Sequence, residues 1–256
     1  MAIPSPRRCN WAPTTTCARS PAMRKFLFAA LLALPLLASA AAPPKPFEAD
    51  YEVRRNGEVI GVGHIRLRSL PEGGFEMSTR SEGTAGLAAV AGVKREETSR
   101  LRWTGDGLES TDYRMRQKAA WNTREQHTTM DPRSHAVTST YKGETARYAG
   151  RPGLLDKQAV TAAMMVAVAD GQRGLLRFPI AERKGVEEQR YEVAAAVRLR
   201  TAIGVERALR IERRRDTPGG RQTKIWLARN HGWLPLRILQ IEEDGERIDL
   251  RITAIR

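Results

Sequence analysis

Cysteine is almost missing from this chain of 256 residues: Cys9 and Cys17 are the only two, and both precede residue 23. Downstream of them the chain has no disulfide to form, although small exported domains often depend on disulfides. It also has no thiolate that would act as a nucleophile or as a zinc ligand. Stability must therefore come from an apolar core, and about 215 residues are enough to bury one.

Histidine is scarce as well, with His64, His127, His135 and His231 spread along the chain. His127 and His135 flank one turn without standing opposite each other, whereas a zinc site needs three or four converging ligands. The sequence contains no Gly-x-Ser-x-Gly elbow, no phosphate-binding loop and no dinucleotide-binding glycine pattern. We therefore predict a non-catalytic protein without metal or cofactor, and an envelope hydrolase is only a minor alternative.

Long apolar runs are limited to one segment. Residues 23–40 (MRKFLFAALLALPLLASA) have a basic start, an apolar middle and a small-residue end, which predicts a Sec-type signal peptide cleaved after Ala40. Its apolar part, residues 26–38, is shorter than the roughly 20 residues of a membrane-spanning helix. We interpret residues 1–22 as a misassigned upstream extension, with a long signal-peptide n-region as the alternative. Residues 41–256 are then one periplasmic β-rich domain, and because Ala41 is not a cysteine we expect no lipid anchor.

Acidic residues are outnumbered by basic residues in this chain. The formal net charge is +14, and five of the basic residues precede Ala41 without any acid. A basic surplus favours anionic partners. Downstream, however, acids and bases are interleaved, as in residues 183–190 (RKGVEEQR), which is typical of a solvated sheet face. We therefore expect no nucleic-acid partner and keep an anionic component of the cell envelope as a hypothesis.

The sequence does contain long stretches in which apolar and polar residues alternate. From Phe47 to Arg54 apolar and polar residues take turns, which predicts a strand with one buried face. Asn56-Gly57 then favours a tight hairpin turn. The same pattern continues to Tyr148 and resumes from Leu175 to Ile255, with short turn motifs between the segments. About 12 strands are too many for an open twisted sheet to stay flat.

One segment breaks the alternation. Residues 154–169 (LLDKQAVTAAMMVAVA) predict a helix, and every residue from Ala162 to Ala169 is apolar. A helix that is apolar all round is buried on several sides. We therefore predict a mainly β fold: a strongly curled antiparallel sheet or half barrel of about 12 strands, with one main α-helix against its concave face.

Two smaller features accompany this fold. Asp156 stands at the predicted helix start, where its carboxylate is expected to accept hydrogen bonds from free backbone N–H groups. Residues 84–92 (TAGLAAVAG) are small and apolar without a clear period, and their glycines suggest a mobile segment. This segment is interpreted either as a buried connector or as an apolar lip at the mouth of a cavity.

The stretch from Ile225 to Ile238 (IWLARNHGWLPLRI) predicts a hairpin. Pro235 cannot donate a ladder hydrogen bond, so we expect it near a strand start or at a bulge.

Four features together resemble the domain of unknown function 3108 family of exported bacterial proteins: the signal peptide, Phe-Glu-Ala-Asp-Tyr-Glu-Val from Phe47, Leu-Leu-Asp-Lys-Gln-Ala-Val from Leu154, and the Ile-Trp-Leu…Leu-Pro-Leu-Arg-Ile hairpin. The resemblance covers Phe47 to Ile255 and implies no assigned activity. At fold level the closing hairpin also looks like that of periplasmic lipoprotein carriers of the LolA and LolB type, which hold acyl chains in a half barrel. This chain has one convincing helix where those carriers use several.

Two functions follow as hypotheses. In the first, the protein is a binding or carrier module for a lipid or acyl chain, which contacts Met164, Met165 and Val168 on the helix and Leu87 and Val90 in the mobile segment; adaptable methionines suit an irregular ligand. The alternative is that these side chains fill a dry core. In the second, the protein is a structural or assembly factor of the envelope that uses a basic face containing Arg198, Arg200 and Arg210.

Overall fold

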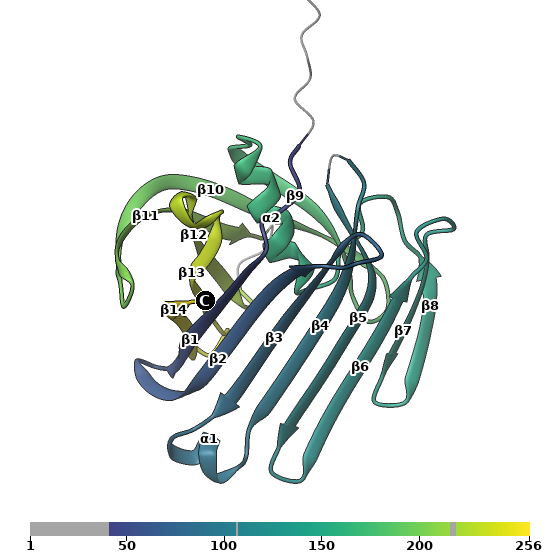
Figure 1. The fold of residues 1–256 in the computed structure, drawn as a ribbon. Helices are drawn as coiled ribbons and strands as arrows, with labels where there is room; N and C mark the ends of the chain where they lie inside the picture. The colour runs from purple at the N-terminus through teal and green to yellow at the C-terminus, as the bar shows by residue number, and fades with distance from the viewer. Residues whose placement is uncertain (1–40, 106, 216–218) are drawn as a thin grey trace, which may run out of the picture. The chain divides into compact units, whose positions relative to one another are not determined.

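The structure is a computed structural model that describes residues 41–105, 107–215 and 219–256. In this part of the chain, fourteen strands form one antiparallel sheet, in the order β8-β7-β6-β5-β4-β3-β2-β1-β14-β13-β12-β11-β10-β9. The first eight strands run as a meander in one direction from β1, and the last six run as a second meander that meets β1 through β14 (Figure 1). We name these two parts the first arm and the second arm.

The first arm consists of consecutive hairpins, because its alternating segments are separated by turns of two to five residues, except for a longer connection between β3 and β4. Its strands are β1 (Phe47–Arg55), β2 (Glu58–Ser69), β3 (Phe75–Gly83), β4 (Lys94–Trp103), β5 (Leu108–Ala119), β6 (Asn122–Met130), β7 (Ala136–Tyr141) and β8 (Glu144–Ala149). A short helix, α1 (Gly86–Val90), lies between β3 and β4. The small apolar segment of the sequence thus contains this helix.

The second arm is a meander as well. Its strands are β9 (Gly174–Ala181), β10 (Val186–Thr201), β11 (Gly204–Arg214), β12 (Gln222–Ala228), β13 (Leu234–Ile241) and β14 (Arg247–Ile255), with a 3-10 turn, η1 (Arg229–His231), before β13. The two arms join where β1 pairs with β14, for example Tyr51 opposite Ile252. The hydroxyl of Tyr51 also donates a hydrogen bond of 2.6 Å to the backbone carbonyl of Pro235.

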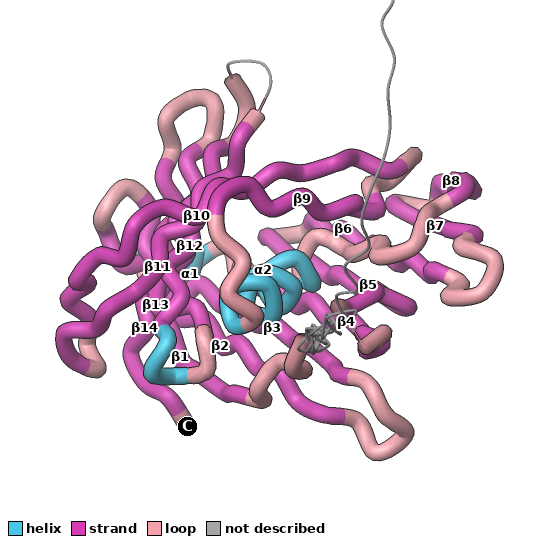
Figure 2. Tube along the Cα trace, turned by 90° about the horizontal axis from the view of Figure 1, so that it is seen from above, coloured by secondary structure: helices cyan, strands magenta, loops and turns pink. Residues whose placement is uncertain are grey.

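The main helix is α2 (Ala159–Ala169), and it lies in the space between the two arms (Figures 1 and 2). Ten of its residues, Ala159 to Val168, are buried. The helix begins five residues later than the sequence predicts, because Leu155 pairs with Ile180 of β9 in a parallel bridge instead of joining the helix. Residues 153–158 therefore lie outside the helix, and we name them the bridging segment.

The curled sheet and its helix confirm the predicted fold class, with fourteen strands in place of about twelve. One of the extra strands arises because the predicted strand from His135 to Tyr148 is the β7–β8 hairpin, which turns at Lys142 and Gly143, both at positive φ. Pro235 is the second residue of β13 and faces a register shift between Trp226 and Leu227, as expected for a proline.

The predicted upstream extension and signal peptide lie outside the described residues. No helix in the described ranges combines the length and apolar character needed to cross a membrane.

Candidate functional site

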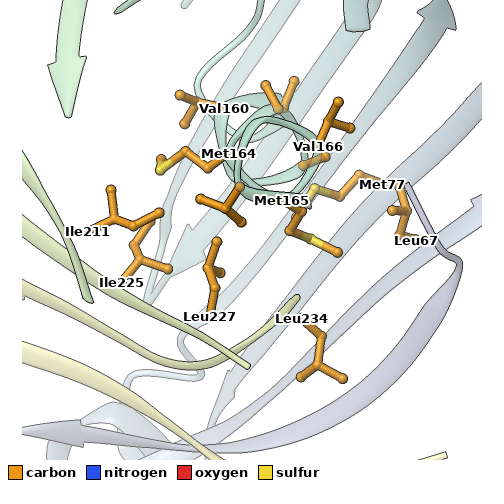
Figure 3. Packing of buried hydrophobic residues seen from close by; sticks show 14 of the residues in the cluster. Leu67, Met77, Val160, Met164, Met165, Val166, Ile211, Ile225, Leu227 and Leu234 are labelled. Carbon is orange, nitrogen blue, oxygen red and sulfur yellow. The ribbon is translucent and has the colours of Figure 1, made fainter. Parts of the chain in front are cut away.

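The interior between the arms is built around α2. Met164 and Met165 are 0% and 1% exposed, and Val168 is 1% exposed. Met164 lies toward Ile211 and Ile225 of the second arm, while Met165 lies toward the first arm (Figure 3). Because a helix without a polar face has to be covered on every side, both arms supply apolar side chains to it. The three residues predicted for ligand contact are therefore brought together, in the core.

The bridging segment connects the two arms next to the helix. The backbone N–H of Ser110 in β5 donates to the carbonyl of Leu154 at 2.9 Å. On the other side, the N–H of Leu155 donates to Pro179 at 2.9 Å, and the N–H of Ala181 donates back to Leu155 at 2.7 Å. The segment thus takes the place of a strand between β5 and β9, although the sheet itself is not closed.

Asp156 fixes the bridging segment to the first arm and to α2. Its carboxylate accepts hydrogen bonds from the hydroxyls of Ser99 at 2.8 Å and Ser110 at 2.7 Å. It also accepts from the backbone N–H groups of Gln158 at 2.9 Å and Ala159 at 3.0 Å, which is the capping role expected from the sequence. Burial raises the pKa of Asp156, while these four hydrogen bonds act to lower it.

A second carboxylate, the half-buried Glu97, lies two residues before Ser99 on the same face of β4. Burial acts to raise its pKa, but two hydrogen bonds from Arg95, at 2.8 and 3.0 Å, and one from the hydroxyl of Tyr113, at 2.6 Å, lower the pKa below the usual value. Neighbouring carboxylates are therefore shifted in opposite directions, because one faces a guanidinium and the other faces hydroxyls and amides.

The polar groups around Asp156 form a polar end of the interior, beside the start of α2. One of them, the side-chain amide of Gln158, has a hydrogen-bonding atom without a partner. Gln158 is 8% exposed, and its Nε2 atom lies 3.3 Å from the hydroxyl of Thr79. Its Oε1 atom is buried and has no hydrogen-bond partner among the described residues. A buried amide oxygen without a donor carries a cost of about 1–3 kcal/mol, so this atom is suited to accept a hydrogen bond from a ligand.

Leu87 and Val90 do not join this interior. They are 82% and 87% exposed on α1, which contacts β2 and β3. Figure 1 shows α1 and α2 toward opposite ends of the first arm. The structure therefore separates these two residues from the three on α2.

The three predicted basic residues do not lie in one group either. Arg198 and Arg200 are exposed on β10, and the cross-strand neighbour of Arg198 is Arg207 of β11. Arg210 lies elsewhere: it faces Trp226 across the β11–β12 pair and forms an ion pair with Glu212 at 2.7 Å. Sequence reasoning missed Arg207, because only the register of the hairpin shows that it stands opposite Arg198.

Two hollows occur elsewhere on the surface. One, of about 890 Å³, lies on β4 to β7 and is lined mainly by side chains of the face that does not carry Glu97 and Tyr113, including Arg116 and Glu125, which pair at 3.2 Å. The other, of about 290 Å³, is bordered by Arg200, Arg237 and Arg251. Neither contains the residues predicted for an apolar ligand.

Three of the histidines lie beside carboxylates: His64 lies 2.8 Å from Asp50, His127 lies 2.6 Å from Asp112, and His231 lies 3.3 Å from Glu206. No group of three or more metal-ligating side chains occurs within the described residues. The interior beside α2 is thus apolar, with the polar groups around Asp156 and Gln158 at one end.

Comparison with protein families adds the decisive observation. The model of the family "Protein of unknown function (DUF3108)" matches residues 50–253. The chain belongs to the DUF3108 family. This agrees with the sequence motifs, which all lie in the matched region or directly before it.

Solved structures resemble this DUF3108 protein at the level of the fold. A beta-barrel-like protein of the domain of unknown function DUF1849 from Brucella abortus matches with a TM-score of 0.56 and 9% identity, covering 84% of this chain and 98% of that one. A candidate lipoprotein from Parabacteroides distasonis matches with a TM-score of 0.35 and 9% identity, covering 85% and 98%. A search of curated proteins gave no match.

Proposed function

We propose that this DUF3108 protein is an exported, non-catalytic binding protein of the bacterial periplasm, which holds the acyl chain of a lipid-like ligand beside α2. The predicted signal peptide supports the compartment. The observation that carries the binding role is Gln158: a buried amide with an unpartnered oxygen lies at the polar end of an interior otherwise lined by apolar side chains. A ligand with an apolar chain and one hydrogen-bond donor fits both parts.

The interior supports such a ligand through adaptable side chains. Met77 of β3 and Met164 and Met165 of α2 all belong to the same buried cluster. Methionine has three rotatable bonds and a polarisable sulfur, so a methionine cluster repacks around an inserted chain at lower cost than branched residues do. In the structure these side chains occupy the interior themselves, so binding requires them to move aside.

The path into the interior is the unclosed seam between the arms. Strands β8 and β9 are the two edges of the sheet, and beyond the bridging segment they are held by side-chain contacts. The hydroxyl of Tyr148 donates to the carbonyl of Glu182, Lys157 pairs with the Glu182 carboxylate at 2.6 Å, and the Arg183 guanidinium lies 3.5 Å from the centre of the Tyr141 ring. Such contacts open at a lower cost than a paired strand ladder.

Native mass spectrometry of the protein purified from its own compartment tests this function. We expect a co-purifying mass that organic solvent extracts. The substitution Gln158→Leu removes the amide oxygen that would accept a hydrogen bond from the ligand. It is expected to lower the ligand occupancy about tenfold, which corresponds to one hydrogen bond of about 1.4 kcal/mol. Gln172→Leu, at an exposed position after the same helix, is the matched control. A wild-type protein that carries no ligand and takes up no fatty acid rules the function out.

A second candidate function is supported by the arginines of the β10–β11 hairpin. Arg198 and Arg207 stand opposite each other and Arg200 follows on the same face, and no ion pair to these three occurs among the described residues. Like charges directly opposite destabilise a sheet, so an anionic partner would relieve the repulsion. We propose an anionic glycan of the envelope as that partner, in an assembly role.

Heparin serves as the probe for this second function. Reversing Arg198→Glu together with Arg200→Glu should lower the salt concentration at which the protein elutes from a heparin column. The charge-matched control is Arg133→Glu with Arg229→Glu, two exposed arginines on other turns. Equal effects of both double variants would show that only the net charge matters.

A further inference from the structure

The strongest unexplained surface is an apolar tip at one end of the first arm. Leu87 and Val90 of α1 are 82% and 87% exposed, and Trp121, in the turn between β5 and β6, is 97% exposed. The two loops are neighbours, because the backbone N–H of Ala120 donates to the carbonyl of Ala91 at 2.5 Å. We name Leu87, Val90 and Trp121 the apolar tip. It lies at the α1 end of the sheet (Figure 1).

The tip is apolar beyond these three side chains. Residues 85–92 (AGLAAVAG) contain no charged or polar side chain, and none of the residues of α1 is buried. Val59 and Val62 of β2, the strand that α1 contacts, add exposed apolar area at 44% and 51%. Single exposed apolar residues are ordinary, but a contiguous group marks an interaction surface.

Charged side chains of both signs lie beside the tip, and the basic ones are not all paired with acids. Lys118 stands opposite Lys94 across the β4–β5 pair, and Arg124 stands opposite Gln117 on the next pair. Lys94 pairs with Glu82 at 2.9 Å, whereas Lys118 and Arg124 form no ion pair within the described residues. Placing two lysines opposite each other costs stability. An anionic partner at the tip would offset this cost.

A bilayer surface fits the tip better than a protein does. A stable protein interface buries about 800 Å² on each partner, whereas the tip is made of two loop ends that carry three large apolar side chains between them. Tryptophan is enriched at the level of lipid headgroups, where its ring is apolar and its N–H finds a hydrogen-bond acceptor. Basic residues behind an apolar insertion add attraction to anionic lipids.

We infer that the apolar tip docks this DUF3108 protein on an anionic phospholipid surface. Leu87, Val90 and Trp121 insert into the interface, and Lys118 and Arg124 contact the headgroup phosphates. This inference rests on the exposed end of the sheet and does not depend on the proposed ligand in the interior. If both hold, docking brings the protein to the membrane from which an acyl chain is taken.

Sedimentation of the processed protein, residues 41–256, with vesicles tests the docking. Vesicles of phosphatidylglycerol and phosphatidylcholine are compared with vesicles of phosphatidylcholine alone. We expect binding to the anionic vesicles that falls at least about tenfold for Leu87→Asp with Val90→Asp, and about tenfold for Trp121→Ala. The matched control is Leu175→Asp, at an apolar position 45% exposed on β9, which should bind as the wild type does.

A second variant separates charge from insertion. Lys118→Glu with Arg124→Glu should reduce binding to anionic vesicles and weaken its dependence on salt, since fewer counterions are displaced. Thermal unfolding of each variant verifies that it is folded, and exposed positions are expected to leave the midpoint unchanged. A wild type that does not bind anionic vesicles, or tip variants that bind as well as the wild type, would overturn the inference. Vesicle binding by a protein found to carry no ligand would leave it standing while removing the proposed function.

Discussion

The two α-helices in the described part of the chain have nearly the same apolar composition and opposite surroundings. α1 (GLAAV) and α2 (AVTAAMMVAVA) contain no charged residue, yet α1 has no buried residue while α2 has ten. The difference comes from their neighbours. α2 lies between two arms of the sheet, whereas α1 lies mainly against β2 and β3 at the end of one arm. Apolar composition therefore predicts a helix that needs a cover, and only the topology decides whether the protein provides that cover.

The largest expected effect comes from truncating the buried helix. Met165→Ala should lower the free energy of unfolding by about 3 kcal/mol, because it removes a fully buried side chain and leaves a cavity. Leu87→Ala in α1 is the counterpart and should stay within about 0.5 kcal/mol. Chemical denaturation measures both. Equal losses for the two variants would mean that α1 is covered in the folded protein.

The next largest effect is expected from weakening the hydrogen bonds that attach α2 to the sheet. Asp156→Ala leaves the hydroxyls of Ser99 and Ser110 and two backbone N–H groups without their acceptor, and should cost about 2 kcal/mol. α1 has no side-chain cap to lose. Hydrogen exchange should show faster opening of residues 153–169 in the variant, with the β1–β3 hairpins protected as before. A uniform increase in exchange over the whole sheet would contradict the local role of Asp156.

The charge on Asp156 provides a pH-dependent version of the same test. Because burial raises the pKa of Asp156, the folded protein binds its proton more tightly than the unfolded chain does. This contribution to stability is fully present below the ordinary pKa of 3.8 and is lost as pH rises through the folded value. In the wild type, the loss of this contribution lowers the free energy of unfolding between acid and neutral pH. Asp156→Asn should remove that fall.

Glu97→Gln is the matched control with the opposite sign. The pKa of Glu97 is lowered, so its contribution is present above the ordinary value of 4.5 and is lost as pH falls. Unfolding free energies measured from acid to neutral pH should thus move in opposite directions for the two variants, relative to the wild type. The same direction for both would show that the two carboxylates share one environment.

The smallest expected effect is on the exposed helix. Leu87→Ser should change the unfolding free energy by less than about 0.5 kcal/mol, since the Leu87 side chain is already exposed in the folded protein. A thermal melt measures this. A fall in the midpoint as large as that of Met165→Ala would remove the contrast between α1 and α2.

Much of this fold was predictable, because hairpins are local. Alternation and turn residues such as Asn56-Gly57 predict the strands, and the composition of residues 162–169 predicts a buried helix. The turn at Lys142-Gly143 was missed because lysine rarely occupies positive φ, and so the sequence gives a weaker turn signal there.

The candidate site was harder to predict, because its contacts join residues far apart in the chain. Leu155 leaves the helix to pair with Ile180, and Ser99 and Ser110 reach Asp156 from two other strands. Arg207 and Trp121 become candidates only when register and loop contacts are known. Periodicity specifies which face a side chain takes, but not which other strand that face meets.

The pairing of β1 with β14 has a consequence for how the molecule assembles. Tyr51 of β1 stands opposite Ile252 of β14, almost the whole length of the domain away in the chain, whereas every other strand pair in the sheet links sequence neighbours. Each arm is thus able to form early from low-contact-order hairpins, and the joining of β1 to β14 is left as the slow, entropically costly step. Until that step, the edge of β1 that will receive β14 is an open template for pairing with another chain. A refolding intermediate with two preformed meanders, prone to aggregate until its last strand docks, is the expected signature of this architecture.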